Sequence, residues 1–193
     1  MCWTSVDDVL GHLYRSDRLI TRILLDGEEP KPEQLDSIKR LTLADRTLFI
    51  ETADSRQTAV DSLDEATTRL SQAEEFKTAA ADLLRTNQWQ AALLKIGECL
   101  QRWQDAQRTV VAVGKFFKVD LERLTIAGRP LSTIMSDFST QLRQFQTALQ
   151  NRDGVGLIDL LIYEGEQTAT MWRNSLCTLR SMILPVPAVQ SVA

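Results

Sequence analysis

The sequence predicts a mainly α-helical protein, an antiparallel four-helix bundle with a small N-terminal α+β appendage. After residue 54, apolar residues recur at alternating steps of three and four, which is the spacing of helices that bury one face. The 193 residues include only 8 Gly and 5 Pro, too few for a fold that depends on many tight turns. Two short runs, 19–25 and 47–52, are rich in β-branched and aliphatic residues and predict strands.

The first 53 residues are predicted to form the α+β unit. Ser5 is placed to cap a short helix that ends near Tyr14. The strand 19–25 ends in an Asp-Gly turn signal, and one or two helical turns are expected after Pro32. The second strand covers 47–52. A two-stranded sheet is marginally stable alone, so we expect it to pack against a helix.

Residues 54–184 are predicted to form the helical bundle. Gly, Pro and Asn residues divide this part into helices of about 54–86, 88–117, 129–150 and 153–183. Short connections between them predict antiparallel neighbours with coiled-coil-like packing. The remaining residues, 185–193, contain two prolines and are expected to be a flexible tail.

The last helix carries the most regular apolar stripe. Its members are spaced as a heptad pattern requires, and they are Val155, Ile158, Ile162, Gly165, Ala169, Trp172, Leu176, Leu179 and Ile183. The helix 88–117 has a matching series that includes Trp89 and Trp103. Because tryptophan buries a large area, this pairing predicts a thick, well-filled core.

Composition excludes several classes of partner. The net charge of −4 gives no general attraction to nucleic acid or to anionic membranes, so neither partner is expected. No apolar run is long enough to cross a bilayer, and the N-terminus lacks the pattern of a signal peptide. The three cysteines are widely spaced and predict neither a disulfide framework nor a zinc site. We therefore expect a cytoplasmic location.

No motif for catalysis, metal or cofactor binding is present. Di-metal helical bundles use Glu-x-x-His pairs, whereas this chain has a single histidine, His12, outside the bundle. Gly154-x-Gly156 has no preceding strand and no third glycine, so it indicates a turn rather than a dinucleotide site. We expect no cofactor, no metal and no catalytic residue, and hence a protein that is not an enzyme.

One polar stripe on the last helix is a candidate pocket. It contains Asp159, Tyr163 and Glu166, with Glu164 on a neighbouring face. The carboxylates of Asp159 and Glu166 are seven residues apart, about 10.5 Å along the helix axis, which is too far for a shared metal ion. A boundary stripe of solvated charges beside the buried face is the favoured interpretation, and a polar pocket is the alternative.

The last helix also resembles the C-terminal signature of an uncharacterised bacterial family of helical-bundle proteins. The matching residues are Asp153, Leu157, Asp159, Leu161, Tyr163, Glu164 and Trp172. The segment 87–103, the Gly-Arg-Pro-Leu element 128–131 and the strand 23–28 are similar to that family as well. The sequence departs from the pattern at Gly165, where a larger apolar residue is expected. The resemblance implies the helical architecture and no particular activity.

Two functions remain open from the sequence. The first is a non-enzymatic interaction, scaffold or chaperone-like protein that binds another protein or a second copy of itself, as a possible homodimer. Surplus apolar residues could supply its contact surface, namely Leu157, Leu160, Met171, Phe116 and Met182. The second is a small-ligand binder or enzyme that uses the polar stripe of Asp159, Tyr163 and Glu166, which requires those side chains to converge on a cavity.

Overall fold

The computed structural model describes residues 5–16, 18–43 and 46–184 of the chain, and the predicted tail 185–193 lies outside these residues. The fold is mainly helical with a small two-stranded antiparallel sheet, as the sequence predicts. Backbone contacts divide the chain into two compact units, Met1–Ala59 and Val60–Ala193.

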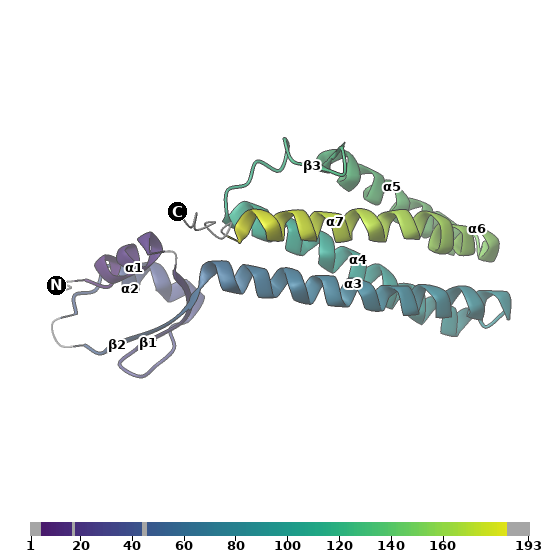
Figure 1. Ribbon diagram of the computed structural model, residues 1–193. Coiled ribbons are helices and arrows are strands. Elements are labelled where there is room, and N and C mark those ends of the chain that lie inside the picture. The colour runs from purple at the N-terminus through teal and green to yellow at the C-terminus, as the bar shows by residue number, and fades with distance from the viewer. Residues whose placement is uncertain (1–4, 17, 44–45, 185–193) are drawn as a thin grey trace, which may run out of the picture. The chain divides into compact units, whose positions relative to one another are not determined.

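The first unit places a helix against the sheet. Strand β1 (Arg18–Leu25) pairs antiparallel with β2 (Leu48–Asp54), and a register shift falls between Ile20 and Arg22. Its helical elements are α1 (Val6–Arg15), the 3-10 turn η1 (Pro32–Gln34) and α2 (Leu35–Lys39) (Figure 1). Val6 and Leu10 of α1 form a core with apolar side chains of both strands, so the sheet is supported by a helix as expected.

Helix α1 begins with a reciprocal cap. The Ser5 hydroxyl accepts from the Asp8 backbone N–H at 3.2 Å, and the Asp8 carboxylate accepts from the Ser5 N–H at 3.1 Å. These two bonds satisfy backbone donors that the first turn of any helix leaves without a partner.

Ser5→Ala is therefore expected to destabilise α1 by about 0.5–2 kcal/mol. Faster amide hydrogen exchange in the first turns of α1, measured on the full chain, would report this loss. Ser136→Ala, at an exposed position of α5, is the matched control and should leave exchange in α1 unchanged. Equal exchange in wild type and Ser5→Ala would contradict the role of the cap.

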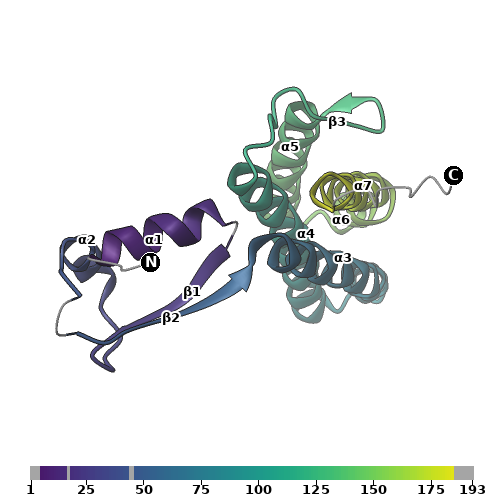
Figure 2. The same cartoon turned by 60° about the vertical axis from the view of Figure 1, so that its left-hand side comes forward.

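The second unit contains four long helical segments. They are α3 (Ser55–Arg85, which begins in the first unit), α4 (Trp89–Phe116), α5 (Leu131–Gln150) and a composite last helix of α6 (Gly154–Asp159), the π-helical turn η2 (Leu160–Glu164) and α7 (Gly165–Ile183). Helices α4 and α7 pack closely and run in the same direction, and α3 and α5 run opposite to them (Figure 1). Figure 2 views these helices from nearer their ends.

The connection between α4 and α5 contains a small hairpin that the sequence analysis missed. Strands β3 (Thr125–Ile126) and β4 (Arg129–Pro130) pair across a turn in which Ala127 and Gly128 both have positive φ. Two central residues in this conformation are typical of the turns that join hairpin strands. The side chain of Ile126 is fully buried, which anchors the connection to the helices.

Two tryptophans occupy the core of this unit. Trp103 of α4 and Trp172 of α7 are both fully buried. The Trp103 ring lies 6.2 Å from that of Phe145, and the Trp172 ring contacts Phe138 edge-on at 5.6 Å. Both phenylalanines come from α5, so each tryptophan links a neighbouring helix to α5 through an aromatic contact that adds to the stabilisation by area alone.

The first half of the last helix buries a different face from the one predicted. Val155 is 72% exposed, whereas Leu157 and Leu161 are fully buried. The π turn holds one more residue than an α turn. As a result, the residues at 157, 161, 165 and 169 are buried at steps of four, and the predicted alternation of three and four resumes after residue 169. The interpretation of Leu157 and Leu160 as surplus surface residues is wrong for the same reason, since both are buried.

None of the described helices combines the length and apolar character that crossing a bilayer requires.

Candidate functional site

A groove of about 340 Å³ lies between α5 and the composite last helix. One wall comes from α5 and the other from η2 and α7, and the hairpin contributes a rim residue. The lining residues are Arg129, Ile134, Asp137, Phe138, Thr140, Gln141, Gln144, Glu164, Gln167, Thr168, Met171 and Trp172. The volume is within the range of ligand sites in proteins, and the lining combines an apolar base with neutral polar side chains.

Gln141 is the most unusual residue of this groove. It is only 4% exposed, a burial that glutamine rarely has without full pairing. Its Oε1 atom lies 2.6 Å from the Thr168 hydroxyl, while its Nε2 atom finds no hydrogen-bond partner among the described residues. Gln141 therefore presents an unsatisfied buried group at the groove.

The Thr168 hydroxyl also lies 3.2 Å from the Glu164 carbonyl oxygen, and a hydroxyl has a single proton to donate. Thr168 therefore donates either to Glu164 or to Gln141. In the recorded orientation of the amide, the Gln141 Nε2 atom has no partner among the described residues.

Trp172 adds a second unsatisfied donor at the same groove. Its indole Nε1–H is buried and has no hydrogen-bond partner within the described chain. A buried donor without a partner costs about 1–3 kcal/mol. Two such groups line this groove, and the indole Nε1 of the core residue Trp103 is likewise buried without a described partner although it lines neither groove.

A second groove adjoins the first and shares Thr140, Gln144 and Glu164 with it. It encloses about 560 Å³ and is lined by α5, α6 and η2, including Asp159. Two arginines and four acids line the pair of grooves: Arg129, Arg143, Asp137, Asp153, Asp159 and Glu164. Acids thus predominate, and one of them, Glu164, lines both grooves.

Two of these acids are already engaged. The Asp137 carboxylate accepts from the Arg129 guanidinium, and Asp153 caps α6 by accepting from the Gly156 N–H at 2.9 Å. In contrast, Asp159 and Glu164 make no ion pair with any described residue. These two carboxylates and the Arg143 guanidinium, which lines the second groove with them, leave a small excess of negative charge there.

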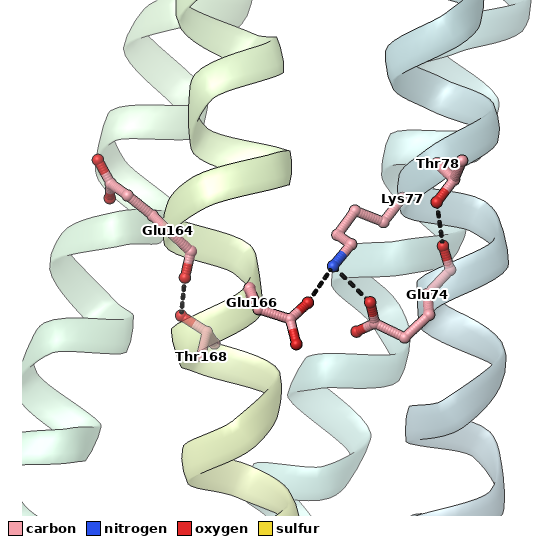
Figure 3. Close-up of polar contacts among 6 residues, drawn as sticks. All are labelled: Glu74, Lys77, Thr78, Glu164, Glu166 and Thr168. Carbon is pink, nitrogen blue, oxygen red and sulfur yellow. Dashed lines mark hydrogen bonds and ion pairs between the residues drawn. The ribbon is translucent and has the colours of Figure 1, made fainter.

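The four residues of the predicted polar pocket do not converge on one cavity. Asp159 and Glu164 line the grooves beside α5, whereas Tyr163 is 70% exposed and lines neither. Glu166 faces α3, where its carboxylate accepts from the Lys77 ammonium at 2.8 Å (Figure 3). Because the π turn contains one extra residue, side chains before and after it point in different directions from the helix axis. The predicted stripe is therefore divided between two sides of the helix.

Lys77 is the most deeply buried charge of the helical unit. The residue is 5% exposed, and its ammonium also pairs with Glu74 one turn earlier on α3 (Figure 3). Burial acts to lower the pKa of Lys77, but the hydrogen bonds and charges of Glu166 and Glu74 outweigh it and raise the pKa above its usual value. Donation from Lys77 is the main cause that lowers the pKa of Glu166. This cluster joins α3 to α7.

Cys99 lies in the same region of the core. Burial is the main cause that raises the pKa of its thiol to about 12, and the Glu74 carboxylate adds to the effect. A thiol with so high a pKa is protonated at neutral pH and is a poor nucleophile. Cys99 therefore acts as a small apolar residue of α4.

The described residues contain no group of three or more His, Cys, Asp or Glu side chains that could hold a metal ion. His12 is exposed on α1. Comparison of the chain with protein-family models, with curated proteins and with solved structures finds no match. The geometry of the grooves is therefore the basis for a functional hypothesis.

The sequence analysis did not identify Gln141 as a candidate site residue, although the spacing of the apolar residues around it provides a signal. The apolar positions of α5 include Phe138 and Phe145, and residue 141 falls three positions after the first and four before the second. A polar residue in such a series is either paired in the core or functional. Leu142, the apolar residue that follows it, is only half-buried in the structure.

Gln141→Leu is expected to leave the free energy of unfolding unchanged or to raise it by up to about 1 kcal/mol, because it removes a buried amide that is only partly hydrogen-bonded. Urea denaturation followed by circular dichroism measures this change. Gln141→Ala, which leaves a cavity as well, should lose stability relative to Gln141→Leu. A loss of several kcal/mol in Gln141→Leu would mean that the amide is fully satisfied in the native protein.

Proposed function

We propose that this chain is a non-enzymatic helical protein that binds a partner protein through the grooves between α5 and the composite last helix. The observation that carries this proposal is the pair of unsatisfied groups, on Gln141 and Trp172, that line one groove. Neutral polar side chains that both donate and accept, such as Thr140, Gln144 and Gln167, suit contact with the polypeptide backbone of a partner.

In this proposal the four long helical segments form a four-helix bundle that acts as a rigid scaffold. Their packing is supported by the Trp103 and Trp172 aromatic contacts and by the Arg180–Asp64 ion pair, which joins α7 to α3 at 2.7 Å. A kinship with the uncharacterised helical family rests on the Asp153–Trp172 pattern, and a cytoplasmic location is supported by the buried thiol of Cys99. Neither nucleic acid nor membrane is proposed as a partner.

The enzyme alternative is less well supported. It requires Asp159, Tyr163 and Glu166 to act together, and their side chains are directed to different surroundings. A second copy of the chain remains a possible partner in this proposal, since Phe116 and Met182 are each more than half exposed.

Site-directed photo-crosslinking tests the proposal in the cells that make the protein. A photoreactive residue at Gln144, which lines both grooves, is expected to give adducts of defined mass. The same residue at Glu75, exposed on α3, is the control and should give none of them. Light scattering of the purified protein distinguishes a second copy from a different partner. No adduct from Gln144, or identical adducts from both positions, would contradict a partner-binding groove.

A further inference from the structure

The two adjoining grooves have the length of an extended polypeptide segment. Their lining on α5 and its C-cap runs from Ile134 to Asn151, which is about 25 Å at 1.5 Å per residue. An extended chain rises about 3.3 Å per residue, so the path accommodates about seven or eight residues. A compact small molecule would leave most of this length unused.

The first groove is suited to an apolar side chain beside a backbone amide. Met171, which is half-buried, provides the accessible apolar part of the lining, whereas Ile134, Phe138 and Trp172 line the groove but are at most 4% exposed. The indole N–H of Trp172 is a donor only, while the free end of the Gln141 amide donates or accepts according to its orientation. A peptide group, which has one acceptor and one donor, complements this pair in either orientation of Gln141.

Access to these two groups requires a small adjustment at the rim. The unsatisfied atoms of Gln141 and Trp172 are shielded from water in this structure. Met171 is half-buried and lines the same groove, and methionine changes rotamer easily because its side chain is unbranched. Contact with a backbone amide therefore requires a rearrangement of side chains that line the groove.

The junction with the second groove is suited to a cation. Glu164 lines both grooves and Asp159 lines the second, and neither carboxylate has an ion-pair partner in the described parts of the chain. Glu164 precedes Trp172 by eight residues, which is about 12 Å along the helix. That span corresponds to three or four residues of an extended chain.

Resting on the function proposed above, the geometry points to a more specific partner. We infer that the grooves bind an extended segment of another protein that carries a large apolar residue and, three or four residues away, a lysine or arginine. The apolar side chain packs against Met171, the apolar lining residue that has accessible surface. The basic side chain pairs with Glu164 and Asp159, and a backbone amide between them satisfies Gln141 and Trp172.

Selection of random nine-residue peptides by phage display on the full chain tests this inference. The enriched peptides are expected to share a basic residue three or four positions from a large apolar residue. Fluorescence anisotropy then measures the affinity of the best peptide for wild type and variants. Asp159→Asn/Glu164→Gln is expected to weaken binding about tenfold or more, since it removes both carboxylates that face the basic side chain.

A matched control and a charge exchange make the result specific. Glu75→Gln/Glu122→Gln removes two exposed carboxylates elsewhere in the helical unit and should leave the affinity unchanged. Glu164→Lys should lower the affinity for the selected peptide. It should raise the affinity for the same peptide with its basic residue replaced by Glu, an effect that a purely structural role of Glu164 would not give. Circular dichroism confirms that each variant is folded.

The outcomes separate this inference from the proposed function. The inference is overturned if the enriched peptides lack a basic residue, or if their affinity is insensitive to Asp159→Asn/Glu164→Gln. In that case the proposed partner-binding groove is still supported if Gln144→Trp, which fills both grooves, abolishes binding of these peptides. Failure to enrich any peptide also overturns the inference, and the photo-crosslinks from Gln144 then decide the proposed function independently.

Discussion

Replacement of Gly165 by alanine is expected to lower the free energy of unfolding by about 1–3 kcal/mol, and replacement by leucine by more. A Cβ atom at Gly165 would lie 2.8 Å from Cη2 of Trp103 and 3.3 Å from the carbonyl oxygen of Leu160. Trp103 is fully buried and contacts Phe145, so its ring has no free space into which it can move. The backbone oxygen of the π turn is equally constrained.

Gly97→Ala is the matched control for this experiment. Gly97 is an exposed residue within α4, and an added Cβ would meet nothing within 4 Å. Because alanine is the better helix former, Gly97→Ala should raise the free energy of unfolding by about 0.5–1 kcal/mol. The same substitution is therefore expected to have opposite signs at two helical glycines, and the steric contact with Trp103 accounts for the difference.

A double-mutant cycle locates the clash. Trp103→Phe removes the part of the ring that approaches Gly165, so Gly165→Ala should cost less in that background than in wild type. Chemical denaturation of the four proteins gives the interaction free energy. Equal costs in the two backgrounds, or a stabilising effect of Gly165→Ala, would show that Gly165 does not serve to admit Trp103.

Local chemistry in the sequence predicted the two strands of the N-terminal sheet well. The runs 19–25 and 47–52 coincide closely with β1 and β2, and the Asp-Gly signal marks a turn in which Asp26 and Gly27 both have positive φ. These features depend on residues near one another in the chain, so composition and spacing suffice.

The last helix shows what spacing alone could not supply. A heptad template from Val155 to Ile183 assumes an uninterrupted α-helix, and it holds from Gly165 onward. The π turn Leu160–Glu164 changes the phase of the helical repeat, that is, which residues face the core, before that point. The Trp103 ring lies where a side chain at Gly165, the residue after the turn, would be. No local pattern in the segment distinguishes such a turn from a regular helical turn.

The same change of phase explains why the candidate site was only partly predicted. Asp159 and Glu164 lie at the grooves, whereas a continuous stripe through Tyr163 and Glu166 does not exist. Gln141 and Thr168 are 27 residues apart and meet through the packing of α5 against α7. A site formed by two helices requires their mutual rotation, which the spacing of a single helix does not determine.

Glu74→Gln/Glu166→Gln is the second variant with a large expected effect, a loss of about 1–3 kcal/mol in the free energy of unfolding. Both substitutions preserve size, but they leave the Lys77 ammonium, in a residue only 5% exposed, without a carboxylate partner. An uncompensated buried charge is more costly than an apolar residue in the same position. Thermal and urea denaturation at pH 7 measure the loss.

Lys77→Met in the same background is the rescue variant. It removes the buried charge while preserving most of the volume, so Lys77→Met/Glu74→Gln/Glu166→Gln should recover stability to within about 1 kcal/mol of wild type. A matched surface control is Glu65→Gln, which breaks the exposed pair with Arg69 and should change stability by less than about 1 kcal/mol. A triple variant no more stable than the double variant would show that burial of the Lys77 charge is not the cause of the loss.

The pH dependence provides an independent check on Glu166. Donation from Lys77 holds the pKa of Glu166 below its ordinary value in the folded protein, so the unfolded chain takes up this proton first as the pH falls. The stabilisation is therefore fully present above the unfolded pKa of about 4.3 and is lost as the pH falls through the folded value. The stability difference between wild type and Glu74→Gln/Glu166→Gln should shrink between about pH 5 and pH 3. A difference that stays constant over this range would show that the Glu166 carboxylate does not stabilise the fold through Lys77.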